Sequence, residues 1–292
     1  MLSGVNGGAG RRLGFYLLLA PVVLWLGLLV VLPLGQMMVI ALSERMGGGV
    51  SRWSAASFGA FAGEPLYWNA LMRTAFFAVT VTVITLVVAF PIAYYIAKLA
   101  PARHKGLLFG LCLLPFWVSE LVRTLGWMII LRETGLLSRM LQGLGLAAGP
   151  VEFLYNDAAM LLGLVYTSLL FMVVPLVTTL DGLDDALIEA GYDLGGNGFV
   201  VLREIVIPYA MPGIVSGSVV VFMLALGNYV AATLMGGKDS LWFTELIYNQ
   251  FIVRFNWELG SAFGFVLLAL SSLVVWLGLK LSRQTLAATL ER

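Results

Sequence analysis

Residues 74–97 read TAFFAVTVTVITLVVAFPIAYYIA, a run without a single Asp, Glu, Lys or Arg. A helix needs about 20 apolar residues to cross the hydrocarbon core of a bilayer, so this run is long enough to span a membrane. The same property recurs at residues 13–43, 158–180, 205–237 and 259–279. A sixth run, residues 106–131, is apolar except for Glu120 and Arg123. We therefore expect six transmembrane helices.

The composition agrees with this expectation and excludes other classes of protein. Of the 292 residues, 60% are hydrophobic and 11% are charged, whereas about a quarter of a soluble chain is charged. The 17 basic and 16 acidic side chains leave no basic excess, so nucleic acid is not an expected partner. The single cysteine, Cys112, cannot close an internal disulfide, and the single histidine, His104, cannot build a multi-histidine site, so no metal is expected.

The fold class follows from the chemistry of the bilayer. Backbone polar groups in hydrocarbon must be satisfied within the chain, which leaves helices or a closed barrel. A barrel would show short strands of alternating polarity, and the sequence has no such alternation. We therefore expect an all-α, polytopic membrane protein with about six transmembrane helices.

Basic residues in short connections set the expected orientation, because Lys and Arg collect on the cytoplasmic side. Lys98, Arg103 and Lys105 lie without an acidic residue between the second and third predicted spans. With six spans, that connection and both ends of the chain fall on the same side of the membrane. The N- and C-termini are therefore expected in the cytoplasm.

Three stretches carry more specific expectations. The run at 13–42 is too long for a cleaved signal peptide, so we expect an uncleaved first helix. The run at 205–237 is too long for one simple helix; we expect an interfacial piece up to Pro212 and then a span of roughly 209–234. Residues 135–141 have the pattern of a short amphipathic helix at the membrane interface.

The sequence contains no recognisable catalytic constellation. Residues 236–238 have the Gly-Gly-Lys of a nucleotide-binding loop, but Asp239 follows them and the earlier glycine of that loop is missing. No nucleophile, base and orienting group occur together in a recognisable pattern. We therefore expect that this chain is not an enzyme.

The segment at 181–208, between the fourth and fifth predicted spans, has a more specific residue pattern than a simple connecting loop requires. Asp184 and Asp185 precede an apolar stretch and suit the first turn of a helix. The glycine-rich residues 195–198 accept left-handed backbone conformations and would end that helix. A second short helix is expected to run up to Pro208.

This segment resembles the EAA loop of bacterial ABC importer permeases. The resemblance rests on the ordered spacing of Glu189, Ala190, Gly191, Gly195, Ile207 and Pro208. It implies that the residues coupling the chain to an ATPase are Glu189, Ala190, Gly191, Asp193, Leu194 and Gly195. The small Ala190 and Gly191 would leave room for the surface of another protein.

Two further stretches resemble the spermidine/putrescine subgroup of these permeases. Residues 114–127 read LPFWVSELVRTLGW, and residues 226–237 read LGNYVAATLMGG. The resemblance implies a type I ABC importer permease fold, with residues 1–292 as one transmembrane domain and a cytoplasmic coupling segment at about 181–208. It implies a permease subunit of an ATP-driven importer in the bacterial inner membrane, with a polyamine or similar organic cation as the transported solute.

The resemblance also implies a set of partners. These are a second permease, identical or homologous, two cytoplasmic ATPase subunits, a periplasmic substrate-binding protein and membrane lipid. The ATPase subunits would bind ATP and Mg, and no cofactor is expected in this chain. The alternatives are a permease for another solute such as an opine or a phosphonate, a structural or regulatory membrane protein, and a self-contained secondary transporter, which would need internal repeats and broken midplane helices.

Glu120 is an acidic side chain inside a predicted span. Counted along a straight helix from Gly106, it lies roughly 21 Å from the cytoplasmic edge, where a carboxylate is costly and needs a partner. Glu120 either pairs locally with Arg123, three residues on, or faces the central path and attracts a cationic substrate. Asn228 stands where the polyamine subgroup usually has an acid. The expected substrate path comprises Glu120, Trp117, Trp127, Asn228 and Tyr229.

Overall fold

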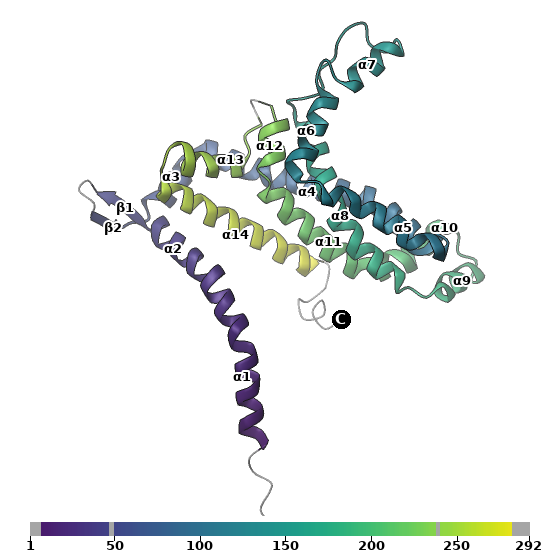
Figure 1. The fold of residues 1–292 in the computed structure, drawn as a ribbon, viewed down its shortest axis with the longest axis horizontal. Helices are drawn as coiled ribbons and strands as arrows, with labels where there is room; N and C mark the ends of the chain where they lie inside the picture. The colour runs from purple at the N-terminus through teal and green to yellow at the C-terminus, as the bar shows by residue number, and fades with distance from the viewer. Residues whose placement is uncertain (1–6, 47–49, 238–239, 282–292) are drawn as a thin grey trace, which may run out of the picture. The chain divides into compact units, whose positions relative to one another are not determined.

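The computed structural model describes residues 7–46, 50–237 and 240–281, and these are almost entirely helical (Figure 1). The first elements are α1 (Gly7–Leu26), α2 (Leu32–Ala41), the strands β1 (Ser43–Met46) and β2 (Val50–Trp53), α3 (Ala56–Gly63), α4 (Pro65–Tyr94), α5 (Ala102–Leu113), α6 (Glu120–Leu131) and α7 (Leu136–Gly143). They are followed by α8 (Asp157–Asp181), α9 (Asp185–Asp193), α10 (Gly198–Val201), α11 (Ile207–Gly227), α12 (Val230–Met235), α13 (Phe243–Tyr248) and α14 (Trp257–Leu281). π-helical turns occupy Gly27–Val31, Tyr95–Leu99, Leu202–Val206 and Asn249–Val253, and a 3-10 turn occupies Leu114–Trp117.

The candidate membrane spans match the predicted number. Five helical runs are long and apolar enough to cross a membrane: Leu17–Ala41, Pro65–Leu99, Asp157–Asp181, Gly198–Gly227 and Trp257–Lys280. A sixth candidate is the pair Ala102–Trp117 and Glu120–Gly143, which is bent by 90° at a short break. The expected all-α fold with about six spans is confirmed when this bent pair is counted as one span. The short helix expected at 135–141 is present as α7.

The third span is not the straight helix that the sequence suggested. The chain turns at Val118 and Ser119, whose ψ angles are 133° and 148°. The Ser119 hydroxyl then accepts a hydrogen bond from the Val122 amide at 3.4 Å, and Glu120 in the first turn of α6 complements the helix dipole. The depth of Glu120 counted along a straight helix is therefore wrong, because a helix start separates this residue from α5.

The fifth span begins and ends earlier than expected. α10, the π turn Leu202–Val206 and α11 form one helical run, so neither a separate interfacial piece nor a short helix ending at Pro208 is present. Pro208 lacks an N–H, and its ring crowds the backbone carbonyl of residue 204, four positions earlier. The wider π turn Leu202–Val206 contains this residue. The run ends at Gly227, because Asn228 has extended backbone (ψ 125°), so the predicted end at 234 is wrong.

The helices α8 and α11 form the centre of the bundle and lie side by side (Figure 1). Two glycines of α11 allow this close approach. A Cβ atom on Gly213 would lie 2.7 Å from the Pro175 carbonyl oxygen, and one on Gly217 would lie 2.8 Å from the Met172 sulfur. Buried apolar side chains line the contact, among them Leu176, Leu180, Ala210, Val221 and Ala225.

The chain divides into two compact units. The smaller unit comprises residues up to 65 and residues 247–266. It contains the antiparallel β1–β2 hairpin, in which Ser43 pairs with Trp53. The rings of Phe61 and Phe263 meet edge to face within it, with centroids 5.6 Å apart. The larger unit comprises residues 66–246 and the chain from 267 onward, and it contains every feature discussed below.

Candidate functional site

The helix α9 has the boundaries that its sequence predicts. The Asp184 carboxylate accepts a hydrogen bond from the Ala186 amide at 3.0 Å and caps the N-terminus, and Asp185 stands in the first turn. The helix gives way to a turn at Gly195, which has the left-handed φ of 83° that glycine accepts readily. The expected helix and turn are therefore present between α8 and α10.

One face of α9 exposes apolar side chains. Leu187 and Ala190 are three residues apart and share a face of α9, and Leu194 directly follows its last residue. All three are exposed. Leu194 is 89% exposed, and Phe199 on the adjoining α10 is 70% exposed. We call these four residues the α9 surface. Glu189, Asp193 and Gly195 are also exposed.

Gly191 lies where α9 packs against the helical run that leads into α11. A Cβ atom here would lie 2.6 Å from the Ile205 side chain and 3.2 Å from that of Val201. Both neighbours belong to the run that leads into α11. The small residue therefore lets α9 pack closely against its own chain. Ala190, by contrast, is exposed.

Polar contacts tie the segment before α9 to three other helices. The Lys98 ammonium donates to the Leu183 carbonyl and lies 2.8 Å from an Asp185 carboxylate oxygen. Lys105, near the start of α5, lies 3.2 Å from an Asp181 carboxylate oxygen. The Tyr209 hydroxyl of α11 donates to the carbonyl of residue 182 at 2.7 Å. The position of α9 is thus set by contacts with α4, α5 and α11 as well as by its link to α8.

The Lys98–Asp185 contact predicts how α9 responds to pH. The hydrogen bond and the charge of Lys98, helped by the charge of Lys105, lower the pKa of Asp185 below its usual 3.8. A carboxyl whose pKa is lowered by folding contributes stability above its unfolded pKa, and loses it only as the pH falls through the lower, folded value. We therefore expect the first-turn amides of α9 to keep their hydrogen-exchange protection, corrected for intrinsic rates, from about pH 8 to about pH 5. A loss of protection within that range would contradict the assignment of this contact.

Two breaks between helices meet at the N-terminus of α6. One lies between α5 and α6, and the other lies between α11 and α12. Glu120 begins α6, and Asn228, between α11 and α12, accepts a hydrogen bond from the Ala231 amide at 2.9 Å. The Asn228 side-chain amide also donates a hydrogen bond to a Glu120 carboxylate oxygen. One asparagine therefore joins the break before α6 to the break between α11 and α12.

A cavity of about 560 Å³ opens beside this contact. It is lined by Phe116, Val118, Ser119, Glu120, Arg123, Thr167, Ser168, Phe171, Leu224, Gly227, Asn228, Tyr229 and Val230. Charged, amide and hydroxyl groups thus face the same space as aromatic rings. Of the expected path residues, Glu120, Asn228 and Tyr229 line this cavity.

The two expected tryptophans do not line it. Trp117 is 81% exposed on the outside of the 3-10 turn, and Trp127 packs edge to face on Tyr166 with ring centroids 5.6 Å apart. Thr167 and Ser168 on α8 also line the cavity, although the sequence motifs did not indicate them. A pair of adjacent hydroxyl residues within an apolar span is the signal that points to them.

The local pair between Glu120 and Arg123 is not present. No ion pair joins these two described residues. The Arg123 guanidinium lies over the Tyr166 ring, 5.9 Å from its centroid, and its Nε is buried without a hydrogen-bond partner. Because α6 starts at Glu120, the carboxylate is free to turn towards Asn228 instead of towards the next turn of its own helix.

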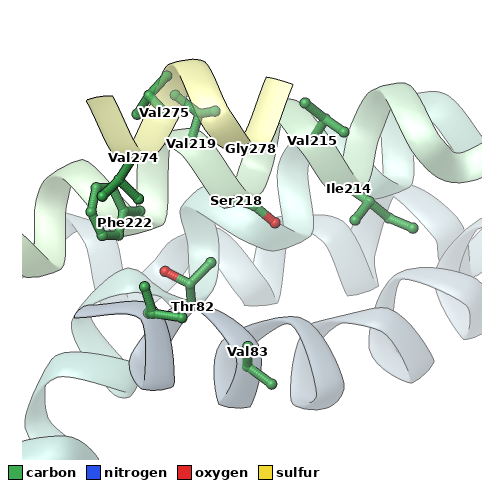
Figure 2. A pocket seen from close by; sticks show the side chains of 11 residues that line it. Thr82, Val83, Ile214, Val215, Ser218, Val219, Phe222, Val274, Val275 and Gly278 are labelled. Carbon is green, nitrogen blue, oxygen red and sulfur yellow. The ribbon is translucent and has the colours of Figure 1, made fainter. Parts of the chain in front are cut away.

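A second cavity, of about 280 Å³, lies between α4, α11 and α14. Figure 2 shows that its walls are mostly apolar side chains such as Val83, Ile214 and Val274, with the hydroxyls of Thr82 and Ser218 as the polar groups. It holds no charged side chain. This cavity suits a hydrocarbon chain rather than a polar solute, so the Glu120 cavity is the candidate site.

Comparisons with known proteins agree with the motifs. No protein-family model matches the chain. The spermidine/putrescine transport system permease protein PotB of Haemophilus influenzae is 35% identical over 217 residues, which cover 73% of this chain and 74% of that protein. PotB of Escherichia coli is 36% identical over 216 residues, covering 73% and 78%. The chain belongs to the PotB-like family of ABC transporter permeases. It is therefore a multi-pass membrane permease, and a self-contained secondary transporter is not favoured.

Solved structures show the same fold for this permease. A bacterial ABC transporter involved in the import of the acidic polysaccharide alginate has a chain that superposes with a TM-score of 0.71, at 17% identity, over 94% of this chain and 96% of that one. An inward-facing methionine transporter, MetNI, gives a TM-score of 0.56 at 16% identity over 76% and 98%. The type I ABC importer permease fold is thus confirmed.

Proposed function

We propose that this permease forms part of the membrane pathway of a binding-protein-dependent importer that takes up a polyamine or a similar organic cation. The observation that carries the proposal is the Glu120 cavity, in which a carboxylate and the Tyr229 ring face one space between two helix breaks. A carboxylate and an aromatic face are the groups that attract an organic ammonium. The PotB relatives are named for spermidine and putrescine transport, which supports the same solute class.

The proposed assembly contains a second permease, identical or homologous, two ATPase subunits that bind ATP and Mg, and a periplasmic binding protein. The chain would lie in the bacterial inner membrane with α9 and both termini in the cytoplasm. One structural neighbour is an alginate transporter in complex with a substrate-bound periplasmic protein, which supports a partner of that kind. ATP hydrolysis belongs to the ATPase subunits in this proposal.

A second candidate solute class is one that carries an anionic group, such as an opine or a phosphonate. It is favoured by Arg123, whose Nε is buried without a hydrogen-bond partner beside the same cavity. To decide between the classes, the periplasmic subunit that copurifies with the permease is titrated calorimetrically with spermidine, putrescine and a phosphonate. Saturable binding of a polyamine alone supports the proposal, and binding of the phosphonate alone overturns it.

The α9 surface is proposed to dock the ATPase, because exposed apolar patches outside lipid mark protein interaction sites. We expect Leu194→Glu to lower the amount of copurified ATPase at least about tenfold, since a charge would be buried in the interface. The folded chain should tolerate this change, because Leu194 is 89% exposed. The measurement is ATPase-to-permease stoichiometry after affinity purification in mild detergent.

Leu146→Glu is the matched control, since Leu146 is 73% exposed but follows α7, far along the chain from α9. It should leave the stoichiometry unchanged. Normal ATPase recovery with Leu194→Glu would mean that the docking surface lies elsewhere.

A further inference from the structure

Lys98 is a buried cation at the end of a membrane span. It lies in the π turn Tyr95–Leu99 that ends the α4 run, and its side chain is 6% exposed. An ammonium withdrawn from water is costly unless it is paired and hydrogen-bonded. Its two partners are the Leu183 carbonyl and the Asp185 carboxylate. Both partners belong to the short stretch that leads from α8 into α9.

Apart from Lys98, the hydrogen bond from Tyr209 to the carbonyl of residue 182 also holds that stretch. Only residues 182–184 separate α8 from α9, and the first of them is a glycine. A short link of this kind lets a helix swing about its end. Lys98 holds one backbone atom of the link and one side chain of the first helical turn, so it contributes to both the position and the direction of α9.

We propose that Lys98 is a positioning residue that fastens α9 to the membrane spans, so that movement of α9 is passed to α4 and α8 instead of being lost in the link. The turn that carries Lys98 packs directly against α8. α8 also supplies Thr167 and Ser168 to the Glu120 cavity. A continuous packed path therefore leads from α9 through the Lys98 turn to the cavity. This inference rests on the proposed role of α9 in ATPase docking.

The neighbouring contact of Lys105 serves as an internal comparison. Its side chain is 36% exposed and that of its partner Asp181 is 61% exposed, so the pair is a surface salt bridge of small weight. Lys105 also donates to the Ala97 carbonyl, but neither of its bonds reaches the link. Lys98 differs because it is buried and because one of its bonds goes to the backbone of the link. Loss of the Lys98 contacts should therefore loosen α9, whereas loss of the Lys105 pair should not.

The test uses the complete transporter, with its copurified ATPase and binding protein, in proteoliposomes. Uptake of labelled spermidine and ATP hydrolysis are measured together, and the readout is solute transported per ATP hydrolysed. We expect Lys98→Met, which keeps the length and the apolar stem, to lower this ratio about tenfold while ATPase recovery stays normal. Lys98→Arg keeps the charge and the donors and should restore most of the ratio. Lys105→Met should leave it within about twofold of the parent.

A second variant covers the case in which Lys98→Met does not fold. Asp185 is 73% exposed, so Asp185→Asn should fold, and it should lower the ratio about threefold because the ion pair is lost while the bond to the carbonyl remains. Asp184→Asn is its matched control, since asparagine caps a helix as well as aspartate does. An unchanged ratio in Lys98→Met and Asp185→Asn overturns the proposal, as does an arginine variant as poor as the methionine variant. Failure of the proposed ATPase docking would show itself separately, as no ATPase recovered with the unaltered chain.

Discussion

Uptake of an organic cation is expected to fall at least about tenfold in a Glu120→Gln variant, because a hydrogen bond to a charged group contributes about 1.5–3 kcal/mol. The substitution isolates the charge. Glutamine still presents a side-chain oxygen to the Asn228 amide, which donates to Glu120 in the parent protein. The bridge between the two helix breaks should therefore persist, and assembly and ATP hydrolysis should be unaffected. The measurement is the initial rate of labelled spermidine uptake at several concentrations, alongside ATPase recovery.

Arg123→Gln provides the comparison, since this residue lines the same cavity but carries the opposite charge. It should not reduce uptake of a cation. Two results would count against a role of Glu120 in the path. Loss of assembly in both variants would mean that the two residues are structural, and unchanged uptake in Glu120→Gln would place the carboxylate outside the path.

Among the substitutions proposed here, Gly213→Leu should give the largest loss of folding stability. Its first added carbon would lie 2.7 Å from the Pro175 carbonyl oxygen and 2.7 Å from the Thr179 hydroxyl, both on α8. Backbone cannot yield as a flexible side chain can, so α8 and α11 must separate. Overpacking of this kind costs about 1–3 kcal/mol and at times more. We expect a lower melting temperature of the purified chain and a loss of monodisperse protein in size-exclusion chromatography.

Gly110→Leu on α5 is the matched control, because no atom lies within 4 Å of a Cβ atom built there. It should leave the melting temperature of the chain close to that of the parent. An equal drop in both variants would show that the effect comes from replacing a helical glycine and not from the α8–α11 contact.

The sequence predicted those features that depend on the surroundings of a segment or on its immediate neighbours. Charge-free runs indicated the membrane spans, because hydrocarbon excludes charge over a length that composition alone reveals. The limits of α9 were readable from Asp184 and Gly195, since a cap and a left-handed turn act within a few residues. The motifs at 114–127, 181–208 and 226–237 identified the family.

The tertiary structure decided which groups meet. The partner of Glu120 is Asn228, 108 positions away, and not the neighbouring Arg123. The apolar run from Gly106 to Leu131 is long enough for one span, so it predicted a single straight helix. Ser119 is a residue that can begin a helix, but this signal was weaker than the length of the run. Gly191 faces Ile205 because α9 folds back on the start of the fifth span. Lys98 reads as one basic residue of a loop, yet it is buried and holds the link to α9. Such contacts depend on which helices pack together. Packing brings together residues that lie far apart along the chain, and the local sequence pattern around each residue does not show which ones will meet.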